Sequence, residues 1–177
     1  MLPYPLHPAI VHFPLVLAFL LPLIAAGAVW SIRRGTRPRR AWSIPVIATL
    51  MLLGSAWASV KTGEAQDERV ERVVAEQPLS VHEEMAEGFL AGAGAVAFVA
   101  AVGLIGGLIG GIARVVTVVA SLVLVLAAVR VGHSGGQLVY KYGAANAYVP
   151  AGNSSSASGA QESLARSGGR DDDDERR

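Results

Sequence analysis

The chain contains four histidines, and histidine is the side chain best suited to bind a metal or exchange a proton near neutral pH. His7 and His12 lie in the motif HPAIVHFP at the start of the first apolar segment, while His82 begins the third segment and His133 ends the fourth. Because the chain has no cysteine, thiolate metal sites, iron–sulfur clusters and covalently attached c-type haem are excluded. Any metal would be held by histidine, carboxylate, methionine or backbone oxygen.

The elements that position these histidines are long uncharged stretches. Hydrophobic residues make up 52% of the 177 residues, charged residues only 16%, and the mean hydropathy is +0.44. Crossing a bilayer core takes roughly 20 apolar residues. The stretches of sufficient length are 8–32, 42–60 and two between 82 and 133, with a turn near 106–114. Since only helices satisfy their own backbone in lipid, the sequence predicts an all-α integral membrane four-helix bundle.

A cleaved signal peptide is the alternative for the first stretch. We reject it because the arginines follow the apolar residues instead of preceding them.

Basic residues predict the orientation of the bundle. The first connection, Arg33–Arg40, has five arginines and no acid, whereas residues 61–84 carry three basic and seven acidic residues. By the positive-inside rule the arginine-rich connection is cytoplasmic, so both termini lie outside. All four histidines would then lie at the extracytoplasmic face of a bacterial inner (cytoplasmic) membrane that the chain crosses several times.

The chain divides into a transmembrane domain, residues 1–150, and a polar tail, residues 151–177. The tail is rich in Ser, Gly and Ala and ends in an acidic run that includes four consecutive aspartates. Such a composition cannot bury a core, so we expect a disordered tail. The net charge of +1 conceals local asymmetry and gives no reason to expect nucleic acid as a partner.

Local context leaves two interpretations open for each histidine. His7 and His12 are five residues apart, so on a regular helix they would point about 140° away from each other. They either share a site through an irregular first turn or anchor the helix in the headgroup layer. Ser80 and Glu83 have capping-box spacing, which predicts that His82 lies in the first turn of the third helix.

Two charged residues fall inside the third and fourth helices at similar depth. Glu87 and Arg130 either form an ion pair, or Arg130 faces an anionic ligand group such as a haem propionate. Gly135 and Gly136 follow His133 and predict the end of the fourth helix. The same glycines would let the backbone approach a flat bound ring.

A stripe of glycines lies near the opposite face. Gly103, Gly107 and Gly111 have the four-residue spacing that lets helix backbones come into close contact. The stripe predicts tight packing of the third and fourth helices there, or alternatively a homodimer.

Three motifs carry a resemblance to a known family. HPAIVHFP, KTGEA after the second helix and GHSGGQLVYKYG after the fourth resemble a bacterial membrane family catalogued as domain of unknown function 2231, over residues 5–145. The resemblance implies a four-helix membrane domain without a settled activity. It also implies a distant relation to two-haem membrane cytochromes b, and hence a ligand role for His7, His12, His82 or His133.

The leading hypothesis is a membrane protein that binds haem b or a metal in an electron-transfer role. Its haem would be ligated by His12 together with His133 or His82, with Arg130 and Lys61 balancing the propionates. A directly bound metal would use His12, His82, His133 and Glu87. With no histidine on the cytoplasmic side, the chain would pass electrons only to a membrane or periplasmic redox partner.

The alternative is an accessory or scaffold subunit without a cofactor, whose histidines are structural. No catalytic nucleophile is evident in either case.

Overall fold

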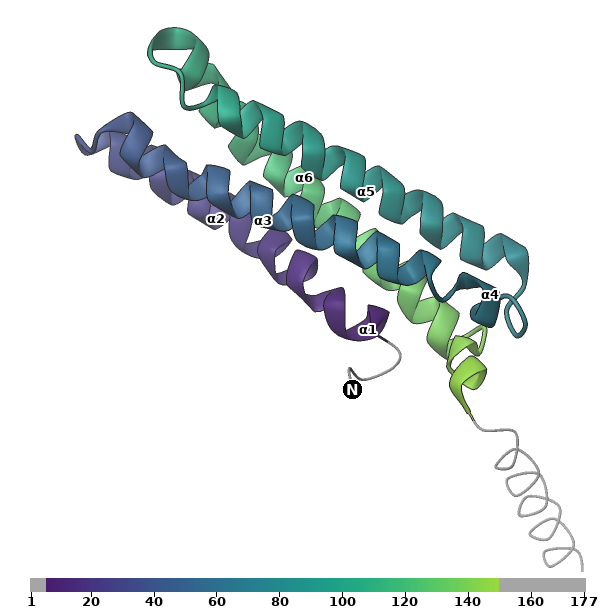
Figure 1. Cartoon of the computed structure of the whole chain (residues 1–177). Helices are drawn as coiled ribbons and strands as arrows, with labels where there is room; N and C mark the ends of the chain where they lie inside the picture. The colour runs from purple at the N-terminus through teal and green to yellow at the C-terminus, as the bar shows by residue number, and fades with distance from the viewer. Residues whose placement is uncertain (1–5, 150–177) are drawn as a thin grey trace, which may run out of the picture.

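The computed structural model describes residues 6–149. Four helices in this part are long and apolar enough to cross a membrane (Figure 1). They are α2 (His12–Arg33), which continues the short α1 (His7–Ile10), then α3 (Pro38–Glu64), α5 (Glu76–Val102) and α6 (Gly107–Tyr140). Two short elements, α4 (Asp67–Val70) and η1 (Ala144–Tyr148), lie at one end. The predicted all-α membrane bundle is confirmed, and the tail prediction for residues 151–177 lies outside the described residues.

The four long helices form a ring in which each packs against two neighbours. Helix α2 contacts α3 and α6, and α5 contacts the same two helices. The interior contains Leu21, Leu52, Phe89 and Leu124 with small alanines between them. Large apolar side chains such as Phe98 and Leu108 point outward and are exposed, as expected of a bundle whose solvent is lipid.

Helix α5 begins earlier than the capping-box spacing predicts. It starts at Glu76, with Ala75 in an extended conformation as the N-cap. The Ser80 hydroxyl donates to the carbonyl of Gln77 one turn back, so it does not cap the helix. Pro78 is compatible with this start because first-turn N–H groups have no intrahelical partner. His82 therefore lies in the second turn, which corrects the prediction.

Helix α6 ends later than its glycines predict. It runs 34 residues, through Gly135 and Gly136, to Tyr140. The left-handed conformation that ends this region is adopted by Gly143 (φ 74°). Gly135 and Gly136 have ordinary negative φ, and the prediction failed because a glycine can serve packing within a helix as well as termination.

The turn between α5 and α6 spans residues 103–106, before the predicted 106–114. Gly103 follows α5, whereas Gly107 and Gly111 belong to α6, so the three glycines do not form a stripe on one helix. A side chain at Gly103 would collide with Trp42 of α3. Gly103 is therefore closely packed, but against α3, and nothing lies within 4 Å of a Cβ at Gly107 or Gly111, so the predicted packing of the third and fourth helices through this stripe is not borne out.

Opposite ends of the bundle differ in charge. Helices α1 and α4, the start of α5 and the end of α6 lie at one end, and the α2–α3 and α5–α6 turns lie at the other (Figure 1). The acidic connection thus lies at the histidine end, far from the arginines of residues 33–40. Helix α6 is about 51 Å long at 1.5 Å per residue, against a hydrocarbon core of about 30 Å. Terminal turns of the bundle therefore extend into the headgroup layers.

Candidate functional site

Two of the four histidines come together at one end of the bundle. The imidazole rings of His7 and His82 have centroids 6.4 Å apart and are nearly perpendicular, at 86°. His7 belongs to the short α1 and His82 to the second turn of α5, so two segments far apart in sequence supply the pair. Both side chains are half-buried.

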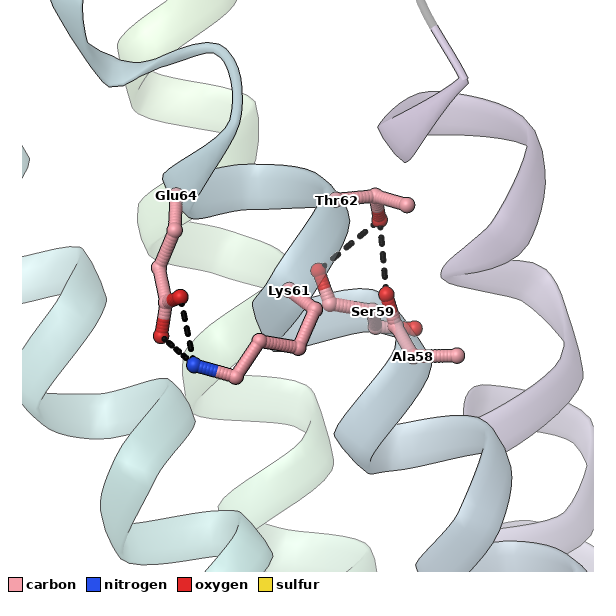
Figure 2. Close-up of polar contacts among 5 residues, drawn as sticks. All are labelled: Ala58, Ser59, Lys61, Thr62 and Glu64. Atoms are coloured by element: carbon pink, nitrogen blue, oxygen red, sulfur yellow. Dashed lines mark hydrogen bonds and ion pairs between the residues drawn. The ribbon is translucent and has the colours of Figure 1, made fainter.

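Helix α3 fixes the orientation of the His7 ring. The His7 Nδ1 atom lies 2.8 Å from the carbonyl oxygen of Ser59 and 3.4 Å from the hydroxyl of Thr62. The Thr62 hydroxyl is itself held by the carbonyls of Ala58 and Ser59, as Figure 2 shows. Because a carbonyl can only accept, Nδ1 must carry the proton, and the His7 Nε2 atom is left with a lone pair.

Helix α6 fixes the His82 ring in the same way. The His82 Nδ1 atom lies 2.8 Å from the Ser134 hydroxyl oxygen. That hydroxyl donates its proton to the carbonyl of Val131 at 2.9 Å, so it accepts from Nδ1–H. The His82 Nε2 atom is therefore also left with a lone pair.

The second nitrogen of each ring is neither hydrogen-bonded nor completely buried. In the part of the chain that the structure describes, no buried side-chain nitrogen or oxygen lacks a hydrogen-bond partner. The hydrogen bonds of His7 and His82 involve only Nδ1. Both Nε2 atoms are consequently at least partly exposed and keep a lone pair that no hydrogen bond uses.

Two glycines bring the helix backbones against these rings. A Cβ atom added to Gly63 would lie 3.3 Å from Cε1 of His7, and one added to Gly135 would lie 3.1 Å from Cε1 of His82. Both distances are shorter than ordinary van der Waals contact. No role was predicted from the sequence for Gly63, although it belongs to the KTGEA motif. Gly135 of the GHSGG motif was expected to let the backbone approach a bound ring, whereas the ring beside it is that of His82.

The other two histidines are exposed and interact locally. The His12 Nδ1 atom is 3.4 Å from the carbonyl of Ala9, and the His133 Nε2 atom is 3.0 Å from the amide nitrogen of Gln137. Because residues 7 and 12 point in different directions from an interrupted helix start, only His7 turns toward α3.

The predicted charged partners are exposed as well. Lys61 forms an ion pair with Glu64 at 2.6 Å on the last turn of α3 (Figure 2). Glu87 and Arg130 are both within the described residues, and no ion pair joins them there. The ion-pair interpretation of these two residues is therefore not confirmed.

Several carboxylates lie near the histidine pair. Asp67 in α4 interacts electrostatically with His7, and its pKa is raised by burial first and by the neighbouring Glu71 and Glu64 next. Among residues 6–149, no three histidine or acidic side chains lie close enough together to hold a metal ion. His12, His82, His133 and Glu87 thus do not form one ligand cluster there, and a metal at His7 and His82 would have two protein ligands.

A small apolar cap covers this end of the bundle. Val74, Leu79, Leu138 and Ala144 pack together between the α4–α5 connection and η1. The Tyr148 hydroxyl donates to the side-chain oxygen of Gln66 at 2.6 Å, which ties η1 to the start of α4. The cap restrains the start of α5 and the end of α6, the two segments that hold His82.

The bundle and its paired imidazoles define a multi-pass membrane protein with a two-histidine site. No family model, curated protein or solved structure matches the chain. The resemblance to domain of unknown function 2231 therefore rests on the three sequence motifs alone.

Proposed function

We propose that this membrane protein binds a metal centre between His7 and His82 and uses it to carry electrons. The observation that supports the proposal is the pair of imidazoles, each fixed as the Nδ1–H tautomer with Nε2 free. Histidines that bind metals through Nε2 nearly always donate the other N–H to a neighbouring oxygen. The two rings have that arrangement independently, through different helices.

The separation of the rings suits a shared metal. A metal–nitrogen bond is about 2 Å long, so two imidazoles on opposite sides of one ion have centroids roughly 6 Å apart. The observed distance is 6.4 Å. A shared metal would therefore leave the separation of the two rings nearly unchanged.

Haem b is the form of this centre that two protein ligands suit best. A haem supplies four nitrogens of its own, so two axial imidazoles complete the coordination of its iron. A bare ion would need further ligands, and three-residue clusters are not found among residues 6–149. Arg130 is the better candidate for a propionate, because Lys61 is already paired with Glu64. When bound, the haem would supply reversible one-electron chemistry.

The position of the site implies where its partner would be. All four histidines lie at one end, so the chain offers ligands for one centre near one surface. We propose a bacterial inner-membrane location with this end outside, and a membrane or periplasmic redox protein as the partner. A homodimer would have to use Gly107 and Gly111, since Gly103 is buried against Trp42.

A structural role for the same histidines is the second candidate. The bond from His7 to Ser59 ties α1 to α3, and the bond from His82 to Ser134 ties α5 to α6. In an accessory or scaffold subunit the imidazoles would serve only to link these helices through the two hydrogen bonds.

Absorption spectra and metal analysis of the full chain purified in mild detergent distinguish the two candidates. The wild type should show a Soret band or one equivalent of a transition metal per chain. H7Q and H82Q should each lose it, while H12Q and H133Q, which replace exposed histidines, should retain it. A wild type that carries neither haem nor metal, even after reconstitution with hemin, would contradict the cofactor proposal. In that case, a lower thermal stability of H7Q and H82Q, but not of H12Q and H133Q, would support the structural role of a scaffold subunit.

A further inference from the structure

A groove opens on the side of the bundle at the end opposite the histidines. It lies between α2 and α3, has a volume of about 410 Å³, and is lined by Leu23, Ile24, Gly27, Ala28, Ser31, Thr36, Arg40, Ala41 and Ile44. Its wall is apolar along the helices and polar only at the terminal turn, where Ser31, Thr36 and Arg40 lie. The groove therefore has the polarity of a single lipid molecule, with a headgroup end and a chain end.

Small residues create the room for such an occupant. A side chain added at Gly27 would find no atom within 4 Å, so the space beside it is empty. Gly27 lies within α2 and has an ordinary φ, so a larger residue can occupy the position without backbone strain. The groove can thus be filled by substitution without changing the helix.

Among residues 6–149, the basic charge at the rim of the groove has no ion-pair partner. Arg33, Arg34, Arg37, Arg39 and Arg40 are all exposed. Within residues 6–149 no carboxylate forms an ion pair with any of the five. The guanidinium of Arg34 lies 5.1 Å from the ring of Trp30, an exposed aromatic of the kind found at headgroup level.

A second, smaller groove repeats the pattern on the other side of α2. It has a volume of about 260 Å³, and its walls are Ala26, Val29 and valines of α6, with Trp30 and Arg33 at the polar end. Basic pockets between transmembrane helices are typical binding sites for anionic lipid headgroups. Each of the two grooves thus combines apolar walls with an arginine at its polar end.

We propose that the α2–α3 groove binds an anionic phospholipid, with its phosphate against Arg40 and an acyl chain along Leu23, Gly27 and Ile44. A zwitterionic lipid would fill the groove equally well but would leave the five arginines uncompensated. The proposal is independent of any cofactor at the histidine end.

Native mass spectrometry of the full chain in detergent tests the proposal with phosphatidylglycerol and phosphatidylcholine of identical acyl chains. We expect the wild type to retain more phosphatidylglycerol than phosphatidylcholine, and R40Q to lower this retention about fivefold. R72Q removes an exposed arginine at the other end and should have no effect. G27L should displace the lipid, whereas G54L, at another helical glycine with empty space beside it, should not.

Two results would overturn the proposal. One is equal retention of the two lipids by the wild type. The other is an equal loss of phosphatidylglycerol in R40Q and R72Q, which would indicate attraction by net charge alone. Should G27L fail to fold by circular dichroism, the comparison of R40Q with R72Q still decides the outcome.

Discussion

Glycine determines how closely the helices can approach the two imidazole rings. A Cβ atom at Gly63 or Gly135 would lie 3.3 or 3.1 Å from a histidine ring, whereas one at Gly136, the next residue, would have no atom within 4 Å. Alanine is favoured over glycine inside a helix by about 1 kcal/mol. Alanine at either Gly135 or Gly136 of α6 gains helix propensity, but only alanine at Gly135 also crowds His82. Comparing the two substitutions therefore measures the cost of that crowding.

We expect G136A to stabilise the protein by up to about 1 kcal/mol, because the new methyl group meets nothing. G135A should gain less or lose stability, since its methyl group would lie 3.1 Å from Cε1 of His82 and the ring would have to shift. It should also weaken a bound metal by about tenfold, as altered support of a ligating histidine typically does. Thermal unfolding and metal titration of both variants measure these effects, and equal behaviour of the two would contradict this account of Gly135.

At the scale of single residues, the sequence indicated that histidines form the site, but it did not indicate that His7 and His82 are the two that come together. Four histidines were predicted at one end, and the segments that carry them, α1, the start of α2, the start of α5 and the last turns of α6, lie at the same end of the bundle (Figure 1). Which of them face each other depends on the break between α1 and α2 at Val11 and on the second-turn position of His82. The positions of helix ends are set by competing local hydrogen bonds, such as the one from Ser80 to Gln77, and composition does not determine them.

Arg114 holds together the turn between α5 and α6. Its Nε atom donates to the carbonyl of Gly103 at 2.8 Å and its Nη2 atom to the carbonyl of Ile105 at 3.1 Å. These carbonyls belong to the end of α5 and the turn, where no following helical N–H is available. Trp42 of α3 packs beside Gly103 and donates to the carbonyl of Ala100, so three helices meet at this point.

R114L should therefore destabilise the protein by about 2 kcal/mol, because it leaves the buried carbonyl of Gly103 and the partly buried carbonyl of Ile105 without their donor. R130L removes an exposed arginine from the same helix and should change stability by less than about 0.5 kcal/mol. Unfolding in a graded series of denaturing detergent compares the two variants. If both lose the same amount, the charge and not the carbonyl contacts of Arg114 would be what matters.

Helix spans were predictable at the element scale because hydropathy over about 20 residues is a strong signal. The predicted stretches 8–32 and 42–60 coincide with α1–α2 and α3. The role of Arg114 was not predictable, because a lone arginine near a turn also occurs in ordinary surface loops. Its function depends on two carbonyls and an indole ring that only the folded chain brings together.

For the whole molecule, the separation of charge relates the two proposed sites to the membrane. The two sites lie at opposite ends of the bundle. The imidazole pair is beside the acidic connection, and the lipid groove is beside the arginines. If arginines remain in the cytoplasm, the lipid site faces the anionic cytoplasmic leaflet and the imidazoles face the opposite side of the membrane. Both proposals therefore imply the same orientation, with the arginine-rich end of the bundle in the cytoplasm.

The absence of native cysteine allows this orientation to be tested with single cysteines. T36C lies in the arginine-rich connection and E68C in α4, and both positions are exposed. In intact cells or spheroplasts that express the chain, a membrane-impermeant maleimide should label E68C at once and T36C only after lysis. The reverse pattern would place His7 and His82 in the cytoplasm, so that a redox partner would have to be cytoplasmic and the arginine groove would face the outer leaflet.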